Sequence, residues 1–168
     1  MAAVRLNHAV LFVSDLERAL DFYARAFGTE VVAREPRANA AFLRLPRSGN
    51  HHDLGLFGLG AEVPPRQPGT VGLYHLAWQV DTIDDLDEAR STLMGIGALT
   101  GESSHGATKS LYGVDPDGNE FEVMWMLPRD AWGEYEHAAP VERLDLPAEV
   151  ERWRGRRTAG RIVEEPAG

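Results

Sequence analysis

The chain contains an internal repeat, and this feature constrains its fold more than any other. Residues 6–28, LNHAVLFVSDLERALDFYARAFG, align with residues 73–95, LYHLAWQVDTIDDLDEARSTLMG. His8 falls on His75, and Gly28 falls on Gly95. In each copy a short apolar run with one histidine precedes an amphipathic helical pattern. We therefore expect two supersecondary units of one kind, each with a histidine at the same position.

Each copy predicts an amphipathic helix with recognisable ends. In the first copy Ser14 and Glu17 form a candidate capping box, and Gly28 is expected to end the helix. In the second copy Thr82 or Asp84 can cap the helix. The residues expected to face inward are Leu16, Ala19, Leu20, Tyr23 and Phe27 in the first helix, and Ile83, Leu86, Ala89, Leu93 and Met94 in the second.

Three strand-like segments follow each helix. They are residues 30–35, 40–45 and 51–59 in the first copy, and the region around 98–100, then 109–115 and 120–127, in the second. Turn signals, SGN in the first copy and DPDGN in the second, precede the last strand of each set. The sequence thus predicts an α+β fold made of tandem βαβββ modules.

The modules have natural boundaries in the composition. The first module is expected over 1–60, the second over 73–127, and a proline-containing linker over 61–72. Residues 128–168 are more charged and only weakly patterned, so we treat them as a C-terminal extension. Within it, 147–157 is expected to be helical, with a frayed end after it.

The charge and residue composition argue against several classes of binding partner and of chemistry. The formal net charge is −9 with no basic stripe, which argues against nucleic acid or an anionic membrane as partner. The chain has no cysteine, so disulfides, thiolate metal sites and a cysteine nucleophile are excluded. No apolar run resembles a signal core or is long enough to span a bilayer, so a cytoplasmic location is expected.

Three polar residues stand in strand segments that are otherwise largely apolar. They are His8, His75 and Glu122. A buried carboxylate needs a charge partner, hydrogen bonds or a metal. Two neutral imidazoles and one carboxylate, with the other positions open, suit a divalent cation and in particular non-haem Fe(II).

Each of these residues also has a simpler interpretation. A single histidine in a strand is more often a satisfied core residue than a metal ligand. Glu122 alone can pair with an arginine such as Arg44 or face solvent. The symmetry favours the metal site, because His8 and His75 occupy one repeat position and a pseudo-twofold fold would bring them together.

This pattern of tandem βαβββ modules with two histidines and a glutamate resembles the vicinal oxygen chelate superfamily. That superfamily includes glyoxalases, fosfomycin and bleomycin resistance proteins, and extradiol ring-cleaving dioxygenases. The resemblance covers residues 6–127 and implies an incomplete β-barrel around a metal site. The stretch from His105 through Tyr112 to Glu122, HGATKSLYGVDPDGNEFE, is similar to the signature of the type I extradiol dioxygenases, with a departure at Ser103.

The resemblance implies a role for each matching residue. His8, His75 and Glu122 would ligate Fe(II), with Mn(II) as a second choice. The family's paired histidines, shortly before the second metal histidine, match NHHDLGLF, so His52 would be the acid/base histidine. His51 is assigned no role, because a regular strand would point it to the opposite face.

The other two matching residues would act on the substrate. His105 and Tyr112 would hydrogen-bond the oxygens of a bound catechol, as the resemblance implies. The simpler interpretations are a loop histidine for His105 and an ordinary half-buried strand tyrosine for Tyr112. The implied reaction inserts O₂ into a catechol-type ring beside the diol and gives a 2-hydroxymuconic semialdehyde type product. A homodimer is implied by the family alone.

Two other functions remain open. A glyoxalase-like lyase or isomerase would use Ni(II) or Zn(II) and a further ligand from the first module. Aligning SGNHHD with DGNEFE places Asp53 opposite Glu122, whereas a shifted register places Gly55 there and supplies no ligand. A metal-free drug-binding protein of the bleomycin-resistance kind is the other alternative, and it gives no reason for all three ligand-type residues.

Overall fold

The computed structural model describes residues 5–64, 67 and 69–159 and consists of two compact units. The first unit contains the described residues up to 64, and the second contains those from 67 to 159. Each unit holds one copy of the repeat. No helix in the described part of the chain has the length and apolar character needed to cross a bilayer.

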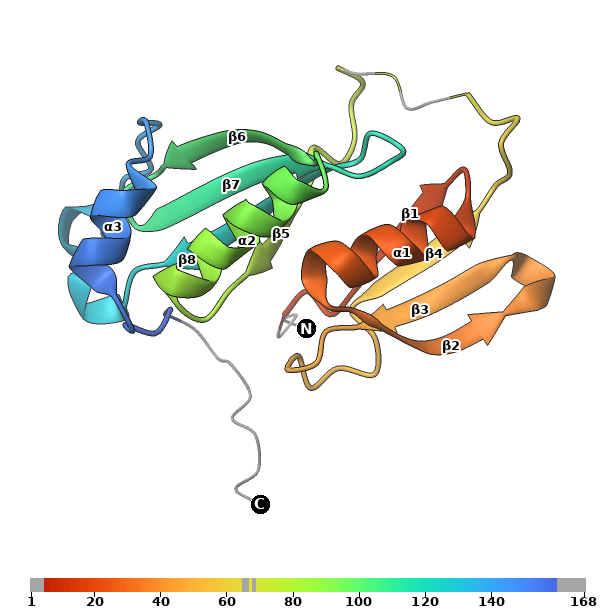
Figure 1. The fold of residues 1–168 in the computed structure, drawn as a ribbon, viewed down its shortest axis with the longest axis horizontal. Coiled ribbons are helices and arrows are strands. Elements are labelled where there is room, and N and C mark those ends of the chain that lie inside the picture. Colours follow the sequence, from red (N-terminus) through yellow and green to blue (C-terminus); the bar gives the residue numbers. More distant parts are fainter. Residues whose placement is uncertain (1–4, 65–66, 68, 160–168) are drawn as a thin grey trace. The chain divides into compact units, whose positions relative to one another are not determined.

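The first unit is one βαβββ module (Figure 1). Its elements are β1 (Ala9–Val13), α1 (Leu16–Phe27), β2 (Glu30–Glu35), a 3-10 turn (Pro36–Ala38), β3 (Ala40–Arg44) and β4 (Leu54–Gly58). The strand order is β1-β4-β3-β2, in which β1 and β4 are parallel and the other pairs are antiparallel. The helix lies over one face of this sheet.

The second unit repeats this arrangement and adds the C-terminal extension. Its elements are β5 (His75–Gln79), α2 (Ile83–Gly95), β6 (Leu99–Ser104), β7 (Thr108–Val114), β8 (Glu120–Met126), two 3-10 turns (Arg129–Ala131 and Gly133–Glu136) and α3 (Leu146–Trp153). The strand order is β5-β8-β7-β6, with β5 parallel to β8. The expected α+β fold of tandem βαβββ modules is confirmed.

Each core lies between a helix and the sheet face that the helix covers. In the first unit the buried residues include Leu11, Val13, Leu16, Ala19, Leu20, Tyr23, Ala41, Leu43, Leu54 and Leu56. In the second they include Ile83, Leu86, Leu93, Leu111, Phe121, Val123 and Trp125. Because side chains alternate along a strand, the intervening residues point to the opposite face of each sheet. That opposite face carries the polar residues considered below.

The helix ends agree with the sequence in part. Gly28 ends α1 in a left-handed conformation at φ 66°, and Thr82 caps α2 in a capping box with Asp85. The expected cap at Ser14 is wrong, because Asp15 accepts the hydrogen bond from the backbone N–H of Arg18 instead. The Ser14 hydroxyl accepts a hydrogen bond from the Arg18 guanidinium, 2.8 Å away.

One residue expected in the core of the second unit lies outside it. Met94 is 55% exposed, whereas its neighbour Leu93 is fully buried. Successive residues of an α-helix are about 100° apart around the axis, so only one of the two can point at the sheet.

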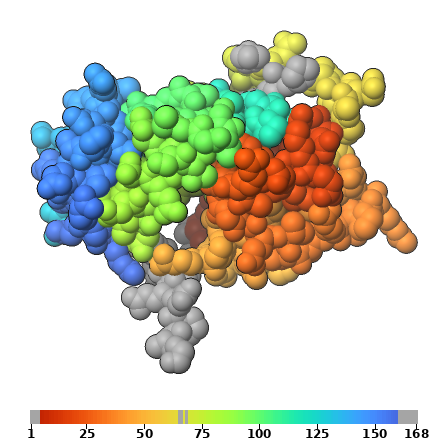
Figure 2. Space-filling model, in the orientation of Figure 1, coloured from red at the N-terminus to blue at the C-terminus, as the bar shows by residue number. Residues whose placement is uncertain are grey.

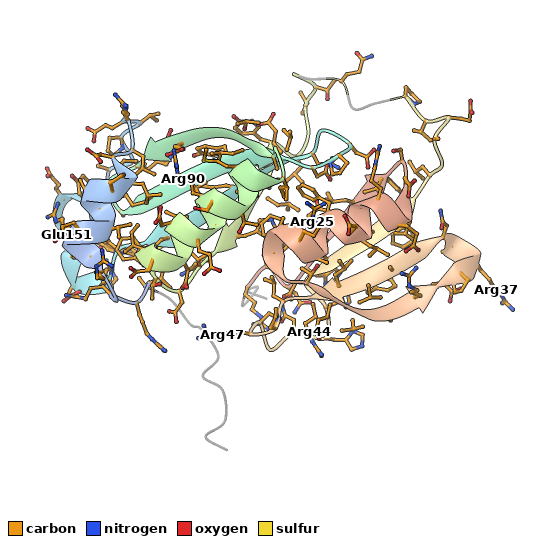
Figure 3. The ribbon with its side chains drawn as sticks, viewed as in Figure 1. Arg25, Arg37, Arg44, Arg47, Arg90 and Glu151 are labelled. Carbon is orange, nitrogen blue, oxygen red and sulfur yellow. The ribbon has the colours of Figure 1, made fainter. Side chains whose placement is uncertain are left out.

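The C-terminal extension packs onto the second unit. The rings of Trp125 and Trp153 lie 6.1 Å apart, and the Lys109 ammonium lies 3.0 Å from the Glu149 carboxylate. Figure 2 shows the surfaces of α3, in blue, and α2, in green, side by side. Glu151 points from α3 away from the sheet (Figure 3). The extension therefore enlarges the helical layer that covers β7 and β8.

The extension helix is shorter than expected. It ends at Trp153 rather than continuing to 157. Gly155 takes a positive φ of 68°, and its N–H donates to the Asp84 carboxylate at 2.8 Å, so the chain turns away there. The frayed end expected after it falls mainly outside the described residues.

Candidate metal centre

Two of the three expected ligands meet on the second sheet. Nε2 of His75 lies 3.2 Å from Oε2 of Glu122. His75 begins β5, and Glu122 lies on the neighbouring β8, where it pairs with Ala77. The flanking residues Phe121 and Val123 are buried on the opposite face, against the helix. Strand alternation therefore points the carboxylate away from the core and toward His75.

This pair has the geometry and chemistry of metal ligands. Two ligand atoms about 2.1 Å from one ion and at right angles to each other are about 3 Å apart, close to the separation of His75 and Glu122. Nδ1 of His75 is buried and has no hydrogen-bond partner among the described residues. One imidazole and one carboxylate, both partly shielded from water, form a donor set that fits a divalent cation.

Tyr112 lies beside the pair on the same sheet face. It is the register partner of Glu122 on β7, and its ring centroid lies 5.9 Å from that of His75. Burial raises the pKa of the Tyr112 phenol, and the negative charge of Glu122 raises it further. The phenol is therefore protonated at neutral pH.

His105 reaches this cluster through Tyr112. Its Nε2 lies 2.7 Å from the Tyr112 hydroxyl, and its Nδ1 lies 2.8 Å from the backbone carbonyl of Pro140. The structure thus brings together four of the six predicted site residues, His75, Glu122, Tyr112 and His105, within the second unit. The contact with Pro140 had no signal in the sequence, since it uses a backbone group in a weakly patterned segment.

The other two predicted residues lie together in the first unit. The rings of His8 and His52 are 4.4 Å apart, and the ring of Phe42 lies edge-on to His52 at 5.1 Å. Nδ1 of His8 is 2.9 Å from the side-chain oxygen of Asn7. Burial lowers the pKa of His52, and the nearby charges of His8 and His51 lower it further. His52 is therefore suited to accept a proton as a neutral base.

The strand expected to begin at residue 51 begins at Leu54 instead. Asn50 and Asp53 explain this difference, because the Asn50 amide donates to the Asp53 carboxylate at 2.7 Å and keeps this stretch in a loop. The expectation that His51 points away from His52 is also wrong, since their Nδ1 atoms lie 3.1 Å apart.

The sheet registers decide which residue corresponds to Glu122. In the second unit Glu122 pairs with Ala77, two residues after His75. In the first unit the residue two after His8 is Val10, and it pairs with Gly55. Gly55 therefore occupies the position equivalent to Glu122. A Cβ at Gly55 would lie 3.3 Å from Val10, so the position is also crowded.

Asp53 has a structural role in the loop that precedes β4. Its two carboxylate oxygens accept hydrogen bonds from the Leu45 backbone N–H at 2.8 Å and from the Asn50 amide at 2.7 Å. These bonds hold the loop between β3 and β4. The first module therefore supplies no carboxylate at the position that mirrors Glu122, and Asp53 is an unsuitable fourth ligand.

The expected ligand set is divided between the units. His75 and Glu122 belong to the second unit and His8 to the first. Within the described residues of either unit alone, no three histidine, aspartate or glutamate side chains form a group able to hold a metal ion. Each unit by itself therefore supplies at most two of the three expected ligands.

Comparison with known proteins identifies relatives of this chain. Residues 5–123 match the family model described as the Glyoxalase/Bleomycin resistance protein/Dioxygenase superfamily. Biphenyl-2,3-diol 1,2-dioxygenase 3 of Rhodococcus globerulus is 37% identical over 121 residues, which cover 71% of this chain and 62% of that protein. Catechol-2,3-dioxygenase of Bacillus subtilis (strain 168) is 30% identical over 127 residues, covering 76% of this chain and 43% of that protein.

The chain thus spans less than two thirds of the length of these two relatives. Among solved structures, the fosfomycin resistance protein FosX of Listeria monocytogenes, complexed with Mn(II) and sulfate, aligns with a TM-score of 0.62. It is 20% identical, and the alignment covers 80% of this chain and 99% of FosX. This likeness supports the fold.

Proposed function

The chain belongs to the glyoxalase/bleomycin resistance protein/dioxygenase superfamily, and we propose that it is an Fe(II)-dependent extradiol dioxygenase. It inserts O₂ into a catechol-type ring and gives a 2-hydroxymuconic semialdehyde type product. One observation carries the proposal: His75, Glu122, Tyr112 and His105 are connected on one face of the second sheet. This groups two candidate metal ligands with a tyrosine suited to bind a substrate oxygen and with the histidine that is hydrogen-bonded to that tyrosine.

His8, His75 and Glu122 hold the metal in this proposal. His8 is included because it occupies the repeat position of His75. Two neutral imidazoles and one carboxylate leave a divalent ion with one net positive charge, which favours a catechol bound as a monoanion. Fe(II), or Mn(II) as a second choice, supplies the redox chemistry that lets O₂ react with the bound ring.

The remaining residues position the substrate and move protons. His52, whose pKa is lowered mainly by burial, accepts a proton from a catechol hydroxyl and later returns it. Tyr112 lies close enough to the His75–Glu122 pair to hydrogen-bond an oxygen of a bound substrate. These roles require no group beyond the metal, O₂ and the catechol.

The strand register weighs against the glyoxalase-like alternative. An isomerase or lyase that takes a further ligand from the first module needs a ligand side chain at the repeat position equivalent to Glu122, and that position is Gly55. A metal-free drug-binding protein is disfavoured because it gives no reason for His75 and Glu122 to lie 3.2 Å apart on one sheet face. Three protein ligands would leave a bound divalent ion able to take both catechol oxygens and O₂ as further ligands.

The test is anaerobic reconstitution of the protein with Fe(II), followed by simple, alkyl, aryl and amino-acid catechols in air. A yellow product and oxygen uptake with at least one of them are expected. No uptake across all four classes would contradict the proposal. Tight Ni(II) or Zn(II) with glyoxalase activity would support the isomerase instead. We further propose a cytoplasmic homodimer, which light scattering of the purified protein tests for its oligomeric state.

A further inference from the structure

The segment of residues 128–145 holds the turn between β6 and β7, although it lies beyond the residues that match the family model. Glu142 pairs with Ser104 through two backbone hydrogen bonds of 2.9 Å. The ring of Tyr135 covers Gly106 so closely that a Cβ there would lie 2.3 Å from it. Gly106 also has a positive φ of 72°, so this close contact depends on glycine.

A third contact of residues 128–145 is made with His105, which belongs to the candidate site. The carbonyl of Pro140 lies 2.8 Å from Nδ1 of His105. A carbonyl oxygen can only accept a hydrogen bond, so Nδ1 must carry the proton. In the neutral imidazole Nε2 is then an acceptor, and it lies 2.7 Å from the Tyr112 hydroxyl, which must donate. The chain of donors runs from Tyr112 to His105 and from His105 to Pro140.

This arrangement leaves His105 no free ring nitrogen for a substrate. One nitrogen binds a backbone carbonyl and the other binds a tyrosine. Tyr112 differs, because a hydroxyl that donates to His105 can still accept a hydrogen bond at its oxygen. His105 therefore acts on the site through Tyr112 rather than by touching a substrate.

We propose that the segment of residues 128–145 is a positioning element of the site. The Pro140 carbonyl fixes His105 as its Nδ1–H tautomer, and His105 orients the Tyr112 hydroxyl so that its oxygen accepts a hydrogen bond from a substrate hydroxyl. The assignment of the His105 tautomer depends only on its contacts with Pro140 and Tyr112, whereas the role of Tyr112 toward a catechol rests on the proposed dioxygenase function. Pro140 and His105 are thus positioning residues.

The tautomer can be measured directly. Neutral histidine in water favours the Nε2–H form, so the expected state is the opposite of the default. Long-range ¹H–¹⁵N spectra of the 168-residue chain, recorded before iron is added and at a pH above the usual histidine pKa of about 6.5, report which nitrogen carries the proton. The His105→Gln variant identifies the signal among the six histidines. An Nε2–H form or a rapidly averaged ring would overturn the proposal.

Two variants test the action of the segment. Glu142→Pro removes the N–H that donates to Ser104, whereas the matched control Glu142→Ala keeps it. Tyr135→Ala removes the ring over Gly106 and provides a second test of the segment in case the proline variant misfolds. Its control is Val141→Ala, which changes an exposed neighbour of Pro140. Glu142→Pro and Tyr135→Ala should shift His105 toward Nε2–H and lower kcat on the order of tenfold to a hundredfold, with a smaller change in KM. The two controls should do neither.

The outcomes separate the two proposals. If the Nδ1–H signal is found but no catechol is cleaved by the Fe(II) protein, the positioning of His105 stands and the dioxygenase function fails. If catechols are cleaved but the tautomer and kcat are unchanged in both Glu142→Pro and Tyr135→Ala, the dioxygenase function stands and the positioning role is overturned.

Discussion

Nε2 of His75 lies 3.2 Å from the Glu122 carboxylate, at the separation that neighbouring ligands of one ion would have. Glu122→Gln keeps the size of the side chain and removes its charge, so a divalent ion would lose its one anionic ligand. We expect iron bound per protein, measured by elemental analysis after anaerobic reconstitution, to fall to background. Glu120→Gln is the matched control, because Glu120 lies on the same strand, is exposed and should keep the iron. Full iron in Glu122→Gln would refute the ligand assignment.

His52 is expected to act in turnover and not in metal binding. His52→Ala should keep its iron and lose about 10²- to 10⁴-fold in kcat, because a positioned acid/base group contributes that much. Iron content and oxygen uptake, measured on the same preparation, check this. Arg37→Ala, a change at the tip of the turn between β2 and β3, is the control and should alter neither (Figure 3). Loss of iron from His52→Ala would mean that His52 is a ligand.

The ion pair between Lys109 and Glu149 should anchor the C-terminal extension. The Lys109 side chain is 8% exposed, and its ammonium lies 3.0 Å from Glu149 on α3. Removing one partner leaves the other charge buried, so Lys109→Met or Glu149→Leu should each cost about 3 kcal/mol in the free energy of unfolding. The double variant should be less destabilised than either single variant. Urea unfolding checks this, and additive losses would argue against a buried pair.

Gly113 on β7 tolerates no side chain. A Cβ there would lie 2.3 Å from the ring of Phe121 and 2.8 Å from the carbonyl of Ala98. Phe121 is 1% exposed and has no space to move into. Gly113→Ala should therefore lower the free energy of unfolding by about 1 to 3 kcal/mol. Gly101→Ala on the adjacent strand, where the nearest atom is 3.9 Å away, should change it by less than about 1 kcal/mol. Equal stability of the two variants would contradict the packing.

The elements of the fold were predictable because their periods are visible in the sequence. Alternation and helical spacing locate the strands and helices, and the aligned histidines reveal the repeat. Details that depend on local competition were not predictable. Asp15 rather than Ser14 caps α1, and the bonds of Asn50 and Asp53 delay the start of β4. Both outcomes depend on which polar side chain forms a hydrogen bond with a nearby backbone or amide group, and the sequence pattern does not specify this.

The sequence predicted the residues of the candidate site better than the strand pairing and hydrogen bonds that connect them. The register that places Gly55 at the repeat position equivalent to Glu122 depends on strand pairing, since a shift by two residues keeps the same side chains on the core face. The hydrogen bond from His105 to the Pro140 carbonyl joins residues far apart in the chain through a backbone group. Every residue has a backbone carbonyl, so the residue types in the sequence do not indicate which carbonyl His105 contacts.

The most direct measurement of the central claim is the stoichiometry of oxygen consumption. An oxygen electrode, with a spectrometer following the yellow product, is applied to the Fe(II)-reconstituted protein and to Glu122→Gln treated in the same way. We expect one O₂ consumed for each catechol converted by the unmodified protein, and none by the variant. Equal consumption by both proteins, or oxygen uptake that yields no ring-cleaved product, would contradict the assignment of an extradiol dioxygenase site to this chain.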